Sequence, residues 1–139
     1  MSDRVFFDTN ILVYLQDDGN PRKQGIAKEL FEQYFDDGAI WISEQVLKEF
    51  CNVALKKLGI DPLKLKALVE VFIDSLNMAG APHSIFAKAI DIHIARQYSF
   101  YDSLVIASAA HAGCSVLYTE DMQDGDEVQG VRIANPFQS

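Results

Sequence analysis

The chain has 139 residues, of which 49% are hydrophobic and 23% charged, so it has the profile of a globular protein, and we expect one domain over residues 1–139. The net charge of −8 at pH 7, taken alone, argues against a nucleic-acid-binding protein, because phosphate contacts require Lys and Arg side chains.

The first half of the chain alternates short apolar runs with segments of helical periodicity. Val5–Phe7 and Ile40–Ile42 are apolar runs typical of buried strands. Pro21 favours the start of a helix, and apolar residues recur at helical spacing from there to Phe35. The helices expected in this half are a short turn over Ile11–Leu15, a helix over Pro21–Phe35, and a helix over Glu44–Leu58 that Ser43 caps and Gly59 ends.

The second half continues the alternation. The elements expected, in chain order, are a helix from Pro62 to about Met78, a marginal strand over Ala81–His83, a helix over Ser84–Tyr98, a helix over Asp102–Ala112, a strand over Ser115–Tyr118 and a weaker strand over Val131–Ala134. The stretch Asp121–Gly130 is the most loop-like of the chain. Strands that alternate with helices predict an α/β fold with a mostly parallel sheet.

The compartment is indicated by three negative features. The first residues lack the basic start and apolar run of a signal peptide. The longest uncharged stretch, Ser103–Thr119, is shorter than the roughly 20 apolar residues of a membrane span. Cys51 and Cys114 lie far apart and form no CxxC pair. We therefore expect a cytoplasmic protein with no membrane association and with reduced thiols.

Acidic residues follow two of the predicted strands. Asp8 comes directly after the first strand, and Glu120 and Asp121 come after the strand that ends at Tyr118. Functional groups in open parallel sheets gather at the carboxyl ends of the strands, so these acids are expected at one edge of the sheet. Each has a plain alternative, because Asp8 would also suit a helix cap and the second group a polar turn.

Two further acids lie on predicted helices. Asp102 begins a helix that is apolar on nearly every face, so its carboxylate would be held near the core, although an N-cap is the alternative. Glu49 lies at the border of an apolar helix face and has no Lys or Arg three or four residues away. Carboxylates that converge would repel one another, and a divalent cation relieves that conflict. A set without His or Cys favours Mg²⁺ or Mn²⁺ over zinc.

Charge is segregated along the sequence. The segment that carries Lys48, Lys56 and Lys57 contains few acids, whereas residues 120–127 contain several acids and no basic residue. This pattern would place a basic rim for RNA beside an acidic pocket. On charge alone, two solvated surfaces explain it better.

Five fragments of the sequence resemble PIN domains, in particular the toxins of VapBC-type toxin–antitoxin pairs. They are VFFDTNILVY at 5–14, ISEQVLKEF at 42–50, SFYDSLVIASA at 99–109, VLYTEDMQDG at 116–125 and the closing VRIANPF. The resemblance covers nearly the whole chain. It implies a three-layer α/β/α sandwich with a mostly parallel central sheet.

The resemblance also implies an activity, a metal-dependent endoribonuclease that uses Mg²⁺ or Mn²⁺, together with a homodimer and a cognate antitoxin. The residues implied as catalytic and metal-binding are Asp8, Glu49, Asp102 and Asp121, with Asp124 as a further acid that competes with Asp121 for the metal. The residues implied as supporting polar groups are Thr9, Asn10, Ser103 and Thr119.

Two other functions fit parts of the sequence. A PIN fold that has lost its activity would serve as a protein-binding module, but the full set of acids weighs against that. A phosphatase of the haloacid dehalogenase kind also begins with a strand that ends in Asp. Its general acid, a second Asp two residues later, is replaced here by Asn10, so we rank that function low.

Overall fold

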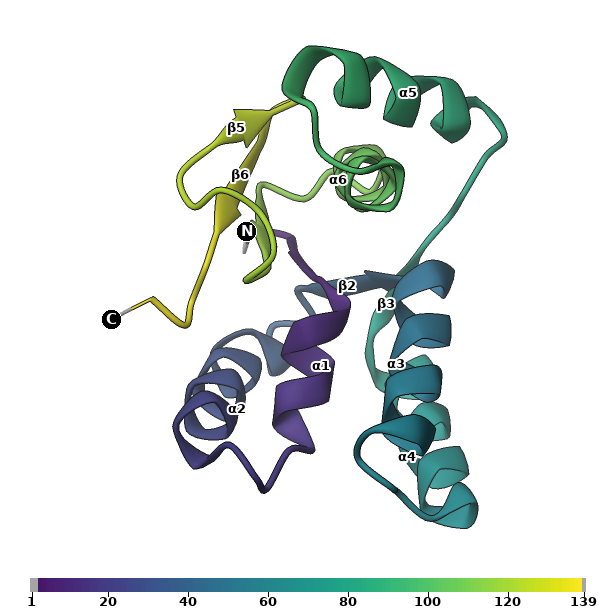
Figure 1. Ribbon diagram of the computed structural model, residues 1–139, viewed down its shortest axis with the longest axis vertical. Coiled ribbons are helices and arrows are strands. Elements are labelled where there is room, and N and C mark those ends of the chain that lie inside the picture. The colour runs from purple at the N-terminus through teal and green to yellow at the C-terminus, as the bar shows by residue number, and fades with distance from the viewer. Residues whose placement is uncertain (1–2, 139) are drawn as a thin grey trace.

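The computed structural model describes residues 3–138 and shows strands and helices in alternation (Figure 1). The elements, in chain order, are β1 (Val5–Phe7), α1 (Thr9–Leu15), α2 (Pro21–Phe35), β2 (Ile40–Ser43), α3 (Glu44–Lys56), α4 (Pro62–Ser75), β3 (Asn77–Ala79), α5 (Ser84–Arg96), α6 (Phe100–His111), β4 (Val116–Tyr118), β5 (Glu127–Val128) and β6 (Val131–Ala134).

The strands form one sheet in the order β3-β2-β1-β4-β6-β5. All neighbours run parallel except β5, which is antiparallel to β6. The three residues of β1 are fully buried, as expected for a strand with neighbours on both sides and helices on both faces. The predicted α/β class with a mostly parallel sheet is therefore confirmed.

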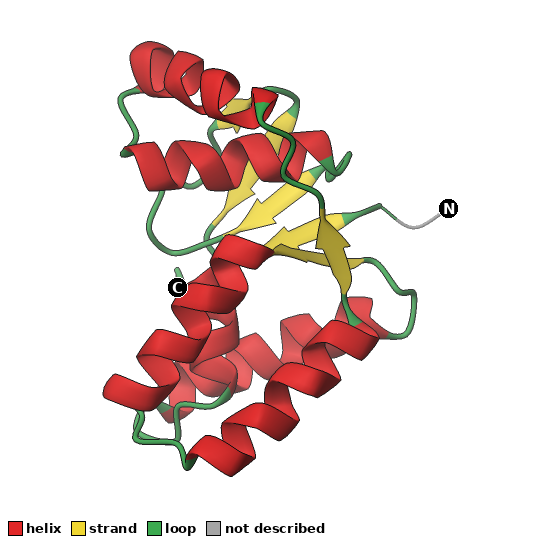
Figure 2. Cartoon of the chain, turned by 90° about the vertical axis from the view of Figure 1, so that its right-hand side faces the viewer, coloured by secondary structure: helices red, strands yellow, loops and turns green. Residues whose placement is uncertain are grey.

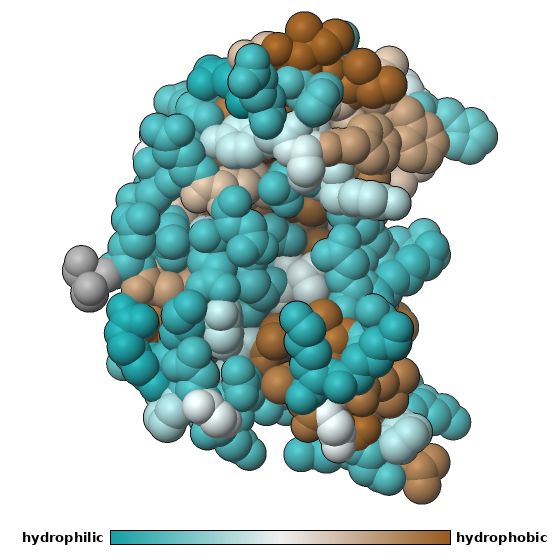
Figure 3. All heavy atoms as spheres, viewed as in Figure 1, coloured by the Kyte–Doolittle hydropathy of each residue, from teal (hydrophilic) through white to brown (hydrophobic). Residues whose placement is uncertain are grey.

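Helices cover both faces of the sheet, which gives three layers (Figure 2). One face carries α6, with α5 packed on its outer side, and the other carries α1 to α4. The buried side of α6 includes Val105, Ile106 and Ala109, in agreement with the prediction that this helix is packed from several sides. On the face shown in Figure 3, hydrophobic side chains gather over α5, where Ile90 and Ile94 are exposed.

The carboxyl ends of β1 and β4 lie side by side. The register pairs Phe7 with Tyr118, and the backbone N–H of Asp8 donates to the carbonyl oxygen of Tyr118 at 3.1 Å. One residue further on, the N–H of Thr119 donates to the carbonyl oxygen of Ala134 at the end of β6, at 3.0 Å. The polar residues that follow these strands are thereby fixed at one edge of the sheet.

The expected helix from Pro62 to Met78 and the expected strand at Ala81–His83 are both wrong in part. The helix ends at Ser75, and the strand lies earlier, at Asn77–Ala79. The side-chain amide of Asn77 donates to two backbone carbonyl oxygens in and before β2, at 2.8 and 3.0 Å, and so ties this segment to the sheet edge. Residues 81–83 form no strand.

Two helix ends on the α5–α6 side also differ from expectation. Gln97 has a φ of 62°, a left-handed conformation that ends α5 before Tyr98. Ser99 caps α6, because its hydroxyl accepts from the N–H of Asp102 at 3.1 Å. The helix therefore begins at Phe100, and Asp102 lies in its first turn instead of at its N-cap.

The stretch Asp121–Gly130, expected as a loop, contains the two-residue strand β5. It pairs with β6 through a tight turn in which Gln129 and Gly130 have φ values of 54° and 79°. Such hairpin turns usually carry Asn-Gly or Asp-Gly, and here Gln129 takes the place of the Asn or Asp, which weakens the signal in the sequence. Within residues 3–138, no helix is long and apolar enough to cross a membrane.

Candidate active site

Asp8 lies at the carboxyl end of β1, directly before α1, and is almost completely buried, at 4% exposure. Its Oδ1 accepts a hydrogen bond from the N–H of Thr9 at 2.7 Å, and its Oδ2 accepts one from the Thr119 hydroxyl at 2.8 Å. Asp8 is thus also the N-cap of α1. The helix-capping role that the sequence offered as an alternative is therefore present, and both oxygens of this carboxylate are held in place.

The electrostatic environment of Asp8 is unfavourable for its charge. Burial raises the pKa of Asp8 from 3.8 to about 7, against the hydrogen bonds from Thr9 and Thr119 that lower it, and the carboxylates of Asp121 and Asp102 raise it further. The pKa of Asp102 is also raised, chiefly by burial and then by the charges of Asp121 and Glu49. The four acids expected from the sequence are therefore close enough to act on one another.

Glu49 reaches this group from α3. Its Oε2 accepts from the Thr9 hydroxyl at 2.9 Å, and its Oε1 accepts from Nε2 of Gln45 at 3.0 Å. Thr9 thus touches two of the acids, Asp8 through its backbone and Glu49 through its side chain. Glu49 has no Lys or Arg one helical turn away because its hydrogen-bond partners are Thr9 on α1 and Gln45 on its own helix.

Asp121 lies in the turn after β4, and Asn10 holds it there. The Asn10 amide nitrogen lies 3.1 Å from Oδ2 of Asp121 and 3.1 Å from the Thr119 hydroxyl oxygen. The Asn10 oxygen in turn accepts from the N–H of Glu120 at 3.3 Å, and the Thr119 oxygen accepts from the N–H of Asp121 at 3.1 Å. The polar positions Asn10 and Thr119 therefore orient this turn.

Two other expected site residues have different surroundings. Asp124 accepts a hydrogen bond from the N–H of Asn135 at 2.8 Å, and it is not among the charges that act on Asp8 or Asp102. Ser103 is buried, and its hydroxyl donates to the carbonyl oxygen of Tyr98 at 3.4 Å, so it holds the α5–α6 connection. Of the two competing acids, Asp121 is the one beside the site.

A network that sequence reasoning missed anchors the same turn from the other side. Glu120 accepts from the Tyr14 hydroxyl at 2.5 Å and forms an ion pair with Lys23 at 2.7 Å. The Lys23 ammonium also lies over the ring of Tyr14, 4.8 Å from its centroid. These residues come from α1, α2 and the turn after β4, and no local pattern in the sequence connects them.

A groove of about 600 Å³ runs from the acids along α1 and α3. Thr9, Asn10, Glu49 and Asp121 line it, and so does Lys57 at the C-terminal end of α3. Of the other lysines expected to bind RNA, Lys56 is exposed and does not line the groove, and Lys48 is paired with Glu44 at 3.9 Å on the surface.

The acids suit a hard divalent cation by their chemistry, because they offer only carboxylate oxygens and Asp8 is held at a raised pKa by burial and by neighbouring negative charge. As they stand, no three His, Cys, Asp or Glu side chains among residues 3–138 are close enough together to hold a metal ion. Glu49 and Asp121 are bound instead by Thr9 and Asn10. Binding of a cation by three or more of these acids would therefore require their side chains to move closer together.

Comparisons with known proteins find a family model and several solved structures that resemble this chain. A sequence model of the PIN domain matches residues 5–123. A toxin–antitoxin complex from Klebsiella pneumoniae is similar in structure, with a TM-score of 0.69, 18% identity, and coverage of 95% of this chain and 97% of that chain. DNA-bound VapBC from Salmonella typhimurium is similar as well, with a TM-score of 0.67, 23% identity, and coverage of 97% of this chain and 99% of that chain.

A VapC toxin from Mycobacterium tuberculosis that cleaves the sarcin–ricin loop is also similar, with a TM-score of 0.62, 20% identity, and coverage of 81% of this chain and 86% of that chain. Identities at this level show a shared fold. Comparison with curated proteins finds no match.

The environment of Asp8 predicts that Asp8→Asn changes the pH dependence of stability. The folded wild type holds the Asp8 proton more tightly than the unfolded chain does. Its free energy of unfolding therefore falls, through this group, by at most about 4 kcal/mol as pH rises from about 4 to about 7. Asn cannot ionise and escapes this loss, although it retains only one of the two hydrogen bonds. In chelator, the thermal midpoint of Asp8→Asn should rise relative to wild type between pH 5 and pH 8.

The matched control is Asp74→Asn, at an exposed position on α4, which should follow wild type at both pH values. An Asp8→Asn protein that melts far below wild type at pH 8 would show that capping of α1 outweighs the repulsion among the acids.

Proposed function

The chain belongs to the PIN-domain family, and we propose that it is a divalent-metal-dependent endoribonuclease, the toxin of a toxin–antitoxin pair. The observation that carries this proposal is the proximity of four acids from four separate segments, Asp8, Glu49, Asp102 and Asp121, of which Glu49 and Asp121 line a groove. The similarity to toxin–antitoxin structures supports the biological role. An antitoxin that covers the acids, a homodimer and a cytoplasmic location belong to the same proposal.

Mg²⁺ or Mn²⁺, when bound by these carboxylates, supplies an activated water and neutralises charge on the phosphoryl oxygens. Asp8 is the rigid ligand, because Thr9 and Thr119 fix both of its oxygens. Glu49 and Asp121 are exposed and adjustable, and either can accept the proton that the attacking water loses. We assign to Lys57, which lines the groove at the C-terminal end of α3, a contact with the RNA backbone.

Asp8 and Asn10 argue against the two alternative functions, an inactive protein-binding module and a phosphatase. A protein-binding module that has lost its activity would have no need to keep Asp8 buried beside other charges, an arrangement that costs stability. A phosphatase of the haloacid dehalogenase kind needs a proton donor at position 10. The side chain of Asn10 is fully engaged in holding Thr119, Glu120 and Asp121.

Glu49→Gln should lower RNA cleavage in Mg²⁺ or Mn²⁺ by about 100-fold or more, because the amide neither binds the cation strongly nor accepts a proton. Glu32→Gln, at an exposed position on α2, is the matched control and should cleave at the wild-type rate. The measurement is single-turnover cleavage of labelled RNA, with unchanged circular dichroism as the test of folding. Normal cleavage by Glu49→Gln would remove this acid from the site.

A water nucleophile should leave a 5′-phosphate and a 3′-hydroxyl, and cleavage should not need the ribose 2′-OH. We therefore expect a substrate with a 2′-deoxy nucleotide at the cleaved position to be cut at a rate close to that of the all-ribose RNA. End-group analysis and rate comparison check this. A blocked deoxy substrate or a 2′,3′-cyclic phosphate product would contradict the mechanism.

Lys57→Gln should weaken RNA binding in chelator and flatten its salt dependence, by a slope of roughly 0.7 for each phosphate of a single strand that the protein no longer neutralises. The experiment measures affinity by fluorescence anisotropy over a series of salt concentrations, with Lys56→Gln tested in parallel as the neighbouring candidate. Lys66→Gln, beyond the groove, is the control. Equal slopes for Lys57→Gln and wild type would make Lys57 an ordinary surface residue.

A further inference from the structure

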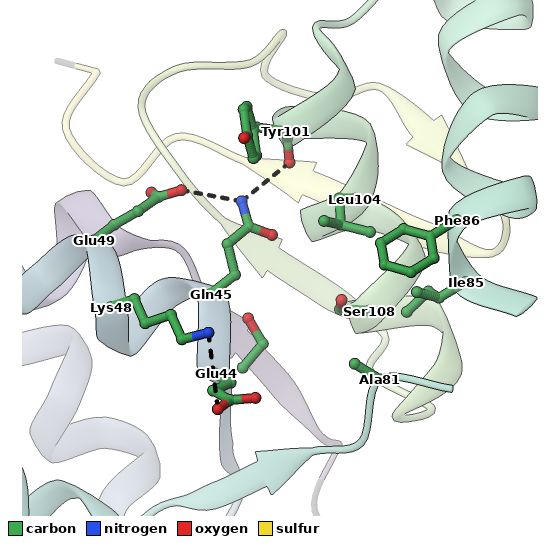
Figure 4. Close-up of a pocket in the computed structure, with 11 residues that line it drawn as sticks. Glu44, Gln45, Lys48, Glu49, Ala81, Ile85, Phe86, Tyr101, Leu104 and Ser108 are labelled. Carbon is green, nitrogen blue, oxygen red and sulfur yellow. Dashed lines mark hydrogen bonds and ion pairs between the residues drawn. The ribbon is translucent and has the colours of Figure 1, made fainter. Parts of the chain in front are cut away.

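Of the four acids, Asp121 has the least support from helices and strands. Asp8 lies between β1 and α1 and caps α1, and Asp102 lies in the first turn of α6. Glu49 lies on α3, where its carboxylate accepts from the side-chain amide of Gln45 at 3.0 Å (Figure 4). Asp121 lies outside every helix and strand, in the turn after β4. The place of its carboxylate therefore depends on the contacts that this turn makes.

The same turn carries two carboxylates side by side. Glu120 and Asp121 both line the groove. The charge of Asp121 raises the pKa of Asp8 and of Asp102, whereas Glu120 is not among the charges that act on either. Glu120 has the same oxygen ligands as Asp121, on a side chain one methylene longer. Some contact must therefore keep Glu120 apart from the acids while its neighbour joins them.

Lys23, on α2, is the cation that holds Glu120. Its ammonium lies 2.7 Å from Oε2 of Glu120, and the Tyr14 hydroxyl donates to the other carboxylate oxygen. The ion pair is partly shielded from solvent, with the two side chains 26% and 21% exposed. Lys23 is itself fixed, because it also donates to the Tyr14 hydroxyl at 3.2 Å and lies over the rings of Tyr14 and Phe137. The Glu120 carboxylate is thus bound at both oxygens.

Asp121 consequently lies between two fixed neighbours. Glu120, before it, is held by its side chain and also by its N–H, which donates to the Asn10 oxygen at 3.3 Å. Met122, after it, is buried in the core. With both neighbours held, the backbone of Asp121 has little freedom, and its side chain is the part that remains able to adjust.

We propose that Lys23 is a positioning residue for the acids: by holding Glu120, it fixes the turn so that the side chain of Asp121, and not that of Glu120, faces Asp8. The inference rests on the proposed metal-dependent nuclease and adds to it a residue outside the four acids. Lys23 acts through Glu120 and touches neither the cation nor the RNA. Removal of groups that orient metal ligands typically weakens metal binding by about 10- to 100-fold.

Two other roles for Lys23 have less support. A contact with RNA would need a free ammonium, and this one is engaged by Glu120 and Tyr14. A structural clamp between the helices and the end of the chain is already supplied by Phe137, which packs against Tyr14 with ring centroids 4.9 Å apart. Such a clamp would not require a carboxylate beside Asp121 together with a cation that neutralises it.

The test measures Mn²⁺ binding without RNA, from the electron paramagnetic resonance signal of the free ion, well below the melting temperature of each variant. Lys23→Met should raise the dissociation constant for Mn²⁺ about tenfold over wild type. The sign is diagnostic, because this variant leaves one more uncompensated negative charge near the acids, which by itself would tighten the binding of a cation. An equal or lower dissociation constant overturns the inference.

A double-mutant cycle shows whether Lys23 acts through Glu120. Glu120→Gln should also weaken Mn²⁺ binding, and the variant that carries both changes should bind no more weakly than the weaker single variant, because the two residues act as one unit. Additive losses would mean that Lys23 acts apart from Glu120, against the inference. Lys23→Arg should restore most of the affinity, since a guanidinium also pairs with a carboxylate. Lys28→Met, at an exposed position on the same helix, is the matched control and should bind as wild type does.

A measurement in chelator separates this inference from the proposed function. Amide hydrogen exchange reports how firmly the turn is held when no cation is present. In Lys23→Met, the N–H groups of Glu120 and Asp121, which bond Asn10 and Thr119, should exchange about tenfold faster than in wild type. Unchanged exchange at both amides contradicts the inference. If wild type binds no Mn²⁺ or cleaves no RNA, the proposed function fails, and the exchange rates alone decide whether Lys23 fixes the turn.

Discussion

One buried carboxylate, Asp8, links the backbone of the sheet to the chemistry at its edge. Its hydrogen bond to Thr119 joins the ends of two parallel strands whose residues lie more than a hundred positions apart in sequence. The strand register places Thr119 opposite Asp8, and Thr119 in turn accepts from the backbone of Asp121. The arrangement of Asp8 and Asp121 therefore follows from strand pairing in the core, and the conformation of the turn after β4 contributes less to it.

The acids differ in how firmly they are held, and this division suits a site that must bind a cation and release a product. Asp8 is fixed in both oxygens, and Asp102 lies in the first turn of the most deeply packed helix. Glu49 and Asp121 are exposed, and their hydrogen bonds come from the side chains of Thr9 and Gln45 for Glu49 and of Asn10 for Asp121. In the proposed nuclease, Asp8 and Asp102 would position the cation and Glu49 and Asp121 would adapt to it. Without a cation, the negative charge of Asp8 is poorly solvated.

The sequence predicted the parts of the molecule that depend on local pattern. Strand ends located Asp8 and Asp121, and the lack of a helix partner singled out Glu49 before its contacts with Thr9 and Gln45 were known. The parts that it missed depend on contacts distant in sequence. Asn77 pins β3 through side-chain bonds to the chain near β2, Gln129 takes a left-handed conformation that favours Gly or Asn, and Lys23 meets Glu120 from the far end of the chain. The side-chain amide of Gln45 likewise donates to the carbonyl oxygen of Tyr101 at 3.4 Å, a contact that no spacing in the sequence predicts.

The strand order has a consequence for the chain while a ribosome is still making it. β1 precedes the other strands of this sheet in the chain, yet in the sheet it lies between β2 and β4, and β4 is made only after α1 to α6. A nascent chain that has not reached residue 119 has Asp8 without Thr119 or Asp121. The residues that hold Lys23 in place extend further still, because its ammonium also lies 5.7 Å from the ring centroid of Phe137. Non-local pairing of this kind is slow to form, and the four acids cannot come together before residue 121 has been made.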